Sequence, residues 1–234
     1  TRATETSVQK AIDATWGQVL TFGGELCDAR FSKCCGGTTE LFSTCWASDD
    51  KAYLPALPDT PGHIPLDTAN ADGTIVVPFC SLADSPLLAR VFNSYDRETT
   101  DFYRWTQVYE LRELSALVRE KSGVDIGELT ALEPLAKGAS GRIFRLRVVG
   151  TKNSFIVGKE LEIRRILSPS HLRSSAFDVE FTSDGRVILR GLGWGHGVGL
   201  CQIGAAVMAD RGYGYRAILE HYYPGTQVSE SLSK

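Results

Sequence analysis

A glycine stands at every second position of the stretch GLGWGHGVG, which runs directly into LCQIGAA. These glycines are Gly191, Gly193, Gly195, Gly197 and Gly199. Alternate side chains of an extended strand share a face, so this spacing predicts a strand with one bare face. The other face would carry Leu192, Trp194, His196 and Val198. A bare face allows a neighbouring strand or a ligand to approach the backbone closely.

The residues between the glycines suggest a ligand. Trp194 and His196 offer a flat apolar ring beside a hydrogen-bonding ring, a pair suited to a sugar. A helix expected from about residue 200 to 211 would present its free N–H groups near the same point. The alternative is structural: a Gly-rich turn in which His196 is a buried histidine, hydrogen-bonded to backbone. Both interpretations stay open at this point.

Common nucleotide and hydrolase motifs do not occur in the sequence. The glycine spacing fails the GxGxxG dinucleotide pattern, and no GK[ST] P-loop is present. The sequence also lacks an HExxH zinc motif, so Glu220-His221 is not a metalloprotease pair, and it lacks a GxSxG nucleophile elbow.

Length and charge narrow the class of protein. The 234 residues, 43% of them hydrophobic, can bury one large core or two small ones. A net charge of −3 does not indicate nucleic-acid binding, which is typical of strongly basic domains. The sequence has no run of about 18 apolar residues, the length that a membrane-spanning helix requires. Because the chain opens TRATETSVQK, with no initiator methionine or signal peptide, we expect a processed or excised piece of a longer protein.

Tight-turn signals predict antiparallel hairpins. Gly23-Gly24, AKGASG and Asp184-Gly185 are each flanked by alternating apolar residues. Helical spacing appears over residues 4–15, in ELRELSALVREKSG before Gly123, and in YRAILEHYY. This mixture predicts an α+β fold of antiparallel hairpins with a few packed helices and a central cleft.

The six cysteines fit more than one chemistry. They are Cys27, Cys34, Cys35, Cys45, Cys80 and Cys201. Cys34, Cys35 and Cys45 cluster in sequence without the paired CxxC spacing of structural zinc sites. We expect a disulfide between Cys45 and one of the vicinal pair, because vicinal cysteines rarely bond to each other without strain. Free buried thiols are an alternative to the disulfide, and metal ligation by these three thiols is less favoured than either.

Two segments carry a resemblance to a known family. The stretch GWGHGVGLCQIGAAVMADRGYGYRAILEHYYPGT resembles the C-terminal signature of the sporulation stage II protein D and amidase-enhancer family. The stretch AIDATWGQVLTFGGELCDARFSKCCGGTTE is similar to the N-terminal part of the same family domain. With the hairpin FDVEF…GRVILRG, the resemblance covers most of residues 8–226.

The resemblance implies cell-wall chemistry outside the cytoplasm, in the periplasm or on the outer face of the envelope. Its members include a lytic transglycosylase that cleaves peptide-free glycan strands of peptidoglycan to 1,6-anhydro-muramoyl ends, using a carboxyl group as acid and then base. It also implies a substrate site at Ser32, Gly36, Gly37, Trp194, His196 and Gln202, with His196 supporting the acid. A wall amidase is an implied partner. Some members bind zinc through Cys and His, although no cofactor is expected here.

This chain departs from the family at the catalytic acid. The family glutamate lies in a segment with a proline and an Ala-rich run, which has no counterpart here and is expected before Thr1. A non-catalytic, wall-binding or amidase-stimulating module is therefore the alternative, and an unrelated function on the same fold stays open. We also expect a core formed by about residues 1–50 and 175–234, with an inserted lobe over about residues 75–170.

Overall fold

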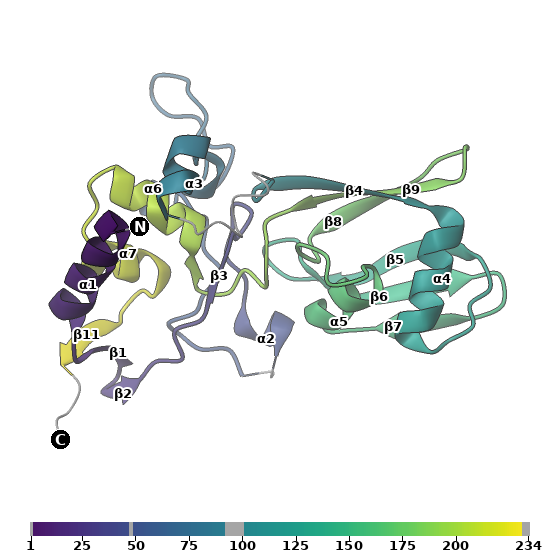
Figure 1. Ribbon diagram of the computed structural model, residues 1–234, viewed down its shortest axis with the longest axis horizontal. Coiled ribbons are helices and arrows are strands. Elements are labelled where there is room, and N and C mark those ends of the chain that lie inside the picture. The colour runs from purple at the N-terminus through teal and green to yellow at the C-terminus, as the bar shows by residue number, and fades with distance from the viewer. Residues whose placement is uncertain (1, 47–48, 92–100, 231–234) are drawn as a thin grey trace.

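The computed structural model describes residues 2–46, 49–91 and 101–230. These residues form two lobes that meet at the glycine-rich stretch (Figure 1). The first lobe holds the beginning and the end of the described chain: α1 and β11 lie at the same end of the molecule (Figure 1). The second lobe is built from the middle of the sequence.

The described part of the first lobe combines five helices with two small sheets. β1 pairs with β2 and with β11, both antiparallel, and the short strands β3 and β10 pair in parallel. Its helices are α1 (Arg2–Thr15), α2 (Phe42–Cys45), α3 (Ser85–Val91), α6 (Gln202–Asp210) and α7 (Tyr215–Tyr222), with 3-10 turns at Pro61–His63 and Phe79–Ser81. Its strands are β1 (Gln18–Phe22), β2 (Glu25–Leu26), β3 (Phe31–Ser32), β10 (Leu200–Cys201) and β11 (Gln227–Glu230).

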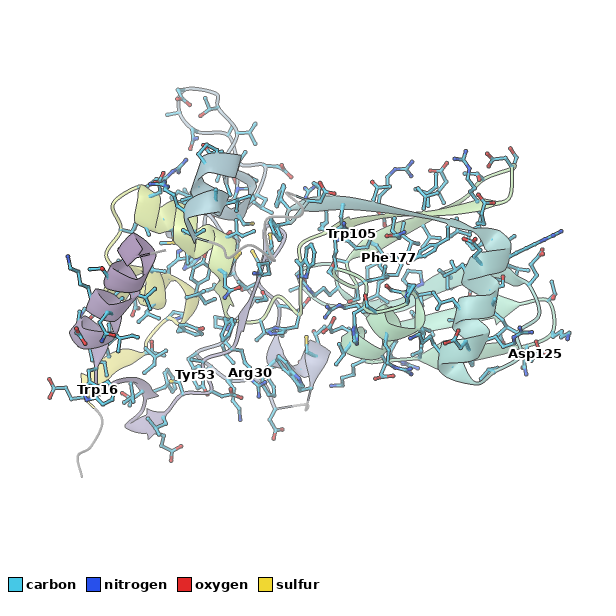
Figure 2. All side chains as sticks on the ribbon, in the orientation of Figure 1. Trp16, Arg30, Tyr53, Trp105, Asp125 and Phe177 are labelled. Atoms are coloured by element: carbon cyan, nitrogen blue, oxygen red, sulfur yellow. The ribbon has the colours of Figure 1, made fainter. Side chains whose placement is uncertain are left out.

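The second lobe packs two helices against two antiparallel sheets, ordered β4-β9-β8 and β5-β6-β7. Trp105 and Phe177 point into its core, with ring centroids 6.4 Å apart (Figure 2). Its elements are β4 (Arg104–Glu110), α4 (Leu111–Ser122), β5 (Leu129–Lys137), β6 (Ile143–Gly150), β7 (Ser154–Val157), α5 (Glu160–Ile166), β8 (Phe177–Phe181) and β9 (Arg186–Leu192).

The α+β class and its antiparallel hairpins are confirmed. The hairpins turn at Gly23-Gly24 and Asp184-Gly185, and α4 ends at Gly123, whose φ of 74° is left-handed. The lobe boundaries stay a prediction. Buried residues form two separate clusters, and Phe177, Val187 and Leu189 belong to the second one. Among the described residues, no helix is long and apolar enough to cross a bilayer.

The glycine-rich stretch is not the strand that its spacing predicts. β9 ends at Leu192, and Gly193, Gly195, Gly197 and Gly199 have φ values of 70°, 91°, 80° and 69°. Left-handed glycines therefore alternate with ordinary residues, and between β9 and β10 only isolated β-bridges, at Trp194 and Val198, replace the expected strand. The expectation was wrong because glycine fits both geometries, so alternate spacing does not distinguish them. Residues 191–199 are called the glycine ladder below.

Substitution of two glycines with similar φ distinguishes the cost of backbone strain from the cost of side-chain crowding. A Cβ on Gly197 (φ 80°) would lie 2.5 Å from the Arg142 guanidinium carbon, whereas a Cβ on Gly185 (φ 83°) would meet nothing within 4 Å. We expect Gly185→Ala to lower the free energy of unfolding by about 1 kcal/mol, the cost of the left-handed backbone. Gly197→Ala should cost about 2–4 kcal/mol, because overpacking is added. Urea unfolding measures both, and equal losses would contradict the crowding.

Candidate functional site

The glycine ladder runs beside residues 30–40 and bonds to them through backbone groups. The Trp194 N–H donates to the Cys34 carbonyl at 2.8 Å, and the Cys34 N–H donates back at 3.0 Å. The Glu40 N–H donates to the Gly197 carbonyl at 2.9 Å. Two segments that resemble the same family are thus hydrogen-bonded to each other, although more than 150 residues separate them in sequence.

Each ladder glycine leaves room for a specific neighbour. A Cβ on Gly191 would lie 2.1 Å from the Trp105 ring, and one on Gly199 would lie 2.1 Å from the Arg30 carbonyl oxygen. Gly193 and Gly197 both face the guanidinium of Arg142. The predicted close approach to the glycine backbone does occur, and the approaching groups belong to other parts of this chain.

Arg142 is the central donor of this region. It is fully buried, and it comes from the end of the turn between β5 and β6 in the second lobe. Its Nε donates to the Gly195 carbonyl at 3.0 Å, and its Nη1 donates to the Cys35 carbonyl at 2.9 Å. A third bond, of 3.3 Å, joins Nη2 to the Cys34 carbonyl. One side chain therefore holds both segments of the site.

Glu40 makes the reciprocal contact from the first lobe to the same turn. Its side chain is fully buried and accepts bonds from the Ala139 N–H, the Ser140 N–H and the Ser140 hydroxyl at 3.1, 3.1 and 2.6 Å. The Leu41 N–H and the Thr44 hydroxyl donate as well, at 2.8 and 3.1 Å. A carboxylate with five donors and no exposed surface has no oxygen available for a substrate.

His196 is half-buried, and its ring is held by backbone groups. Nδ1 accepts the Val198 N–H at 3.0 Å, and the ring also hydrogen-bonds to the backbone of Phe31. Burial lowers the pKa of His196 to about 4, and the charges of Arg142, Arg164 and Arg30 contribute. The ring is neutral at physiological pH.

Two tryptophans along the ladder each carry a stacked arginine. The Arg173 guanidinium lies 5.3 Å from the ring centre of half-buried Trp194. The Arg30 guanidinium lies 4.4 Å from the ring centre of Trp46, whose own ring centroid is 4.8 Å from that of His196. Flat apolar faces beside cations can bind sugars that bear carboxylates.

The other predicted site residues lie beside the ladder. Ser32 is buried, 5% exposed, and a Cβ on Gly195 would lie 3.2 Å from its Cβ. A Cβ on Gly36 would lie 3.0 Å from the Gly193 nitrogen, so these two backbones touch. Gly37 is buried, and Gln202 is half-buried as the first residue of α6. Their roles in binding stay predictions.

The expected disulfide of Cys45 was wrong. All six cysteines are free thiols, and the Cys45 Sγ lies 3.6 Å from the His196 carbonyl. Burial raises the pKa of the Cys45 thiol, which keeps it protonated. Cys35 instead faces Cys80, with 3.7 Å between the sulfur atoms. The disulfide was predicted from proximity in sequence, but the chain turns between residues 35 and 45, and the two segments carry their thiols to different neighbours.

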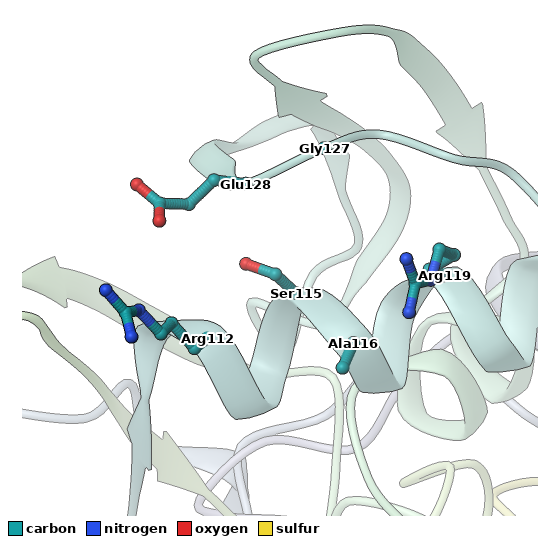
Figure 3. A pocket seen from close by; sticks show the side chains of 6 residues that line it. All are labelled: Arg112, Ser115, Ala116, Arg119, Gly127 and Glu128. Carbon is teal, nitrogen blue, oxygen red and sulfur yellow. The ribbon is translucent and has the colours of Figure 1, made fainter.

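A pocket in the second lobe lies away from the ladder. It has a volume of about 300 Å³ and is lined by Arg112 and Arg119 on α4, with Glu128 across from them (Figure 3). A broader depression of about 530 Å³ reaches the ladder at Gly191, where Arg104 and Arg190 contribute to its wall.

Sequence reasoning missed several residues of this region. Arg142 and Trp46 carry no local pattern, since one arginine in a turn or one tryptophan after a helix is unremarkable. Asp59 lies within the proline-rich segment 53–73, and Cys80 lies shortly after it. Hydrophobic periodicity predicts little structure in such a segment. A buried cation is implied only by the carbonyls around it, which a sequence does not display.

An α+β protein with a glycine ladder packed against an N-terminal segment is the class that the fold and site define. A family model described as a domain of unknown function (DUF8618) matches residues 40–199. The chain belongs to this family and to the stage II sporulation protein D and amidase-enhancer family.

Named relatives are similar along almost the whole chain. The chain is 28% identical to the amidase enhancer of Bacillus subtilis (strain 168), over 95% of this chain and 32% of that protein. It is 25% identical to the stage II sporulation protein D of the same organism, over 97% of this chain and 53% of that protein. The chain thus spans about a third to a half of the length of these curated relatives.

The lowered pKa of His196 makes stability depend on pH. Unfolding restores a pKa near 6.5, so below that pH the unfolded chain binds a proton that the folded chain does not. Stability should therefore fall as the pH drops from 6.5 towards 4, by on the order of 2–3 kcal/mol from this residue. The variant His196→Gln should lack that part of the acid loss.

Urea unfolding at pH 7, 5.5 and 4.5 measures the effect. His171→Gln, the same substitution at an exposed histidine, is the matched control. Parallel pH profiles for wild type and His196→Gln would show that the ring is not held neutral by the fold.

Proposed function

We propose that this chain binds glycan strands of peptidoglycan from which the peptides have been removed, as most of a lytic transglycosylase. The observation that carries the proposal is the ladder beside residues 30–40. Both segments resemble one family, and the two are bonded into one surface with half-buried aromatic rings along it. The relatives named amidase enhancer and stage II sporulation protein D support a role at the cell wall, on the extracytoplasmic side.

The stacked arginines support a peptide-free strand as the ligand. Removing the peptide from a muramic acid leaves its lactyl group as a free carboxylate. Arg173 on Trp194 and Arg30 on Trp46 combine a cation with an aromatic face, as such a sugar requires. A strand that still carries its peptides lacks these carboxylates, so it should bind less tightly.

Carboxylates packed near the ladder do not supply the acid. Glu40 and Asp59 are both fully buried, and their oxygens accept hydrogen bonds from the chain itself. A general acid must reach the glycosidic oxygen within hydrogen-bond distance. We therefore propose that the acid is the glutamate implied by the resemblance. It lies in the family segment with a proline and an Ala-rich run, which has no counterpart in this sequence.

A non-catalytic module is the second candidate. The name of the amidase-enhancer relative and the burial of Glu40 favour it. Both candidates require glycan binding, and only the first requires cleavage by a longer protein that carries the glutamate.

Binding is tested by co-sedimentation of the chain with insoluble peptide-free glycan. Trp194→Ala and Arg173→Gln should each weaken binding roughly three- to tenfold, as expected for the loss of one stacking or cation contact. Trp16→Ala is the control, because Trp16 is 83% exposed at the end of α1, and it should bind like wild type. Equal binding by all variants would contradict the proposal.

Cleavage is tested in the same samples by mass spectrometry of the soluble fraction. The chain of 234 residues should release no 1,6-anhydro-muramoyl ends. Robust release would contradict the assignment of the acid to another segment.

A further inference from the structure

Three thiols and one carboxylate converge in the first lobe, and the function above gives none of these four side chains a role. The ligand atoms of Cys35, Asp59, Cys80 and Cys201 all lie within 4.8 Å of one another. We call these four residues the thiol cluster. None of them is more than 2% exposed. They come from four separate places in the sequence, so only the fold brings them together.

The spacing within the thiol cluster is that of metal ligands. The sulfur atoms of Cys35 and Cys80 lie 3.7 Å apart. A tetrahedral zinc ion with Zn–S bonds of about 2.3 Å holds neighbouring sulfur ligands about 3.8 Å apart. A disulfide would bring two sulfurs to about 2.05 Å and leave the third thiol of the cluster without a partner.

Backbone groups around Cys201 are arranged for a thiolate. Its sulfur accepts the Cys35 N–H at 3.2 Å and the Gly204 N–H at 3.4 Å, as the residue that caps the N-terminus of α6. Hydrogen bonds to a ligand atom orient it towards a metal ion.

Asp59 is oriented in the same way by groups outside the cluster. Its Oδ1 accepts the Tyr222 hydroxyl at 2.6 Å, and its Oδ2 accepts the Cys80 N–H at 2.9 Å. Nε2 of His221 lies 3.7 Å from Oδ1, on a side chain that is only 9% exposed, and it has no hydrogen-bond partner among the described residues. The hydrogen bonds from Tyr222 and Cys80, with His221 nearby, are the outer shell that would orient the Asp59 carboxylate as a metal ligand.

The chain leaves space for this arrangement. A Cβ on Gly204 would lie 2.2 Å from the Tyr222 hydroxyl and 2.7 Å from an Asp59 oxygen. Only glycine at this position of α6 allows the helix to approach the carboxylate.

We propose that Cys35, Cys80, Cys201 and Asp59 bind one zinc ion as a structural site. Three soft thiolates and one carboxylate favour zinc over magnesium or calcium, which prefer oxygen ligands. Four protein ligands complete a tetrahedron and leave no position for substrate, so the ion holds the first lobe together. This set excludes Cys45, and the proposal does not depend on the glycan-binding function.

The first test measures zinc in the full chain. The chain is purified with a thiol-free reductant, incubated with zinc chloride and desalted, and its metal is quantified by mass spectrometry. Wild type and the control Cys45→Ser should each retain about one zinc per chain, whereas Cys80→Ser should retain less than about a tenth. Wild type without zinc, or with two fewer titratable thiols in a Cys35–Cys80 disulfide, would overturn the proposal.

The second test does not require a variant that loses the metal. Wild type loaded with cobalt(II) should show the intense visible bands of a tetrahedral site together with sulfur-to-cobalt charge transfer. Asp59→Asn should keep the charge transfer and shift the visible bands. Weak octahedral bands in wild type would overturn the site.

Cys34 is the competing fourth ligand, because its thiol interacts with those of Cys80 and Cys201. Cys34→Ser should leave zinc binding and the cobalt spectrum unchanged. Loss of zinc in Cys34→Ser, with retention in Asp59→Asn, would overturn Asp59 as the fourth ligand.

Discussion

The buried guanidinium of Arg142 is the interaction on which the rest of the structure depends. It reaches from a turn of the second lobe to carbonyl oxygens of Cys34, Cys35 and Gly195 in the region where the lobes meet. Burying a cation is costly unless its donors are paired, so those carbonyls must stay where they are. Glu40 reaches back into the same turn, and together the two contacts tie the lobes to each other.

The glycine ladder is a consequence of this contact. Gly193 and Gly197 lie against the guanidinium, and a side chain on either would occupy its space. Packing within the chain thus accounts for the glycines themselves. Of the residues between them, Val198 is fully buried, so the functional proposal rests on half-buried Trp194 and its stacked arginine. His196 supports this wall with its ring held by backbone groups.

The sequence predicted local structure well and long-range structure poorly. Turns at Gly23-Gly24 and Asp184-Gly185, and the end of α4 at Gly123, follow from turn chemistry within a few residues. The ladder was mistaken for a strand because the residues that require its left-handed glycines lie far away in sequence. The same reason explains the wrong disulfide, since Cys80, the thiol that faces Cys35, lies 45 residues along the chain.

The candidate site was predictable only in part. The family signature pointed to Ser32, Gly36 and the ladder, and the fold does place those segments side by side. Arg142 and Asp59 could not be singled out, because a buried charge is recognised by its partners and not by its neighbours in sequence. The thiol cluster shows the same limit, since its four members share no spacing.

Hydrogen exchange of backbone amides in the native state tests most directly whether Arg142 and Glu40 make the two lobes one cooperative unit. The informative amides are those of Trp194 and Glu40 beside the ladder, and of Ile143 next to Arg142 in the second lobe. If the lobes open together, all three should exchange with the same free energy of opening, equal to that of global unfolding. An Ile143 amide that exchanges at a clearly lower free energy than the ladder amides would contradict this account.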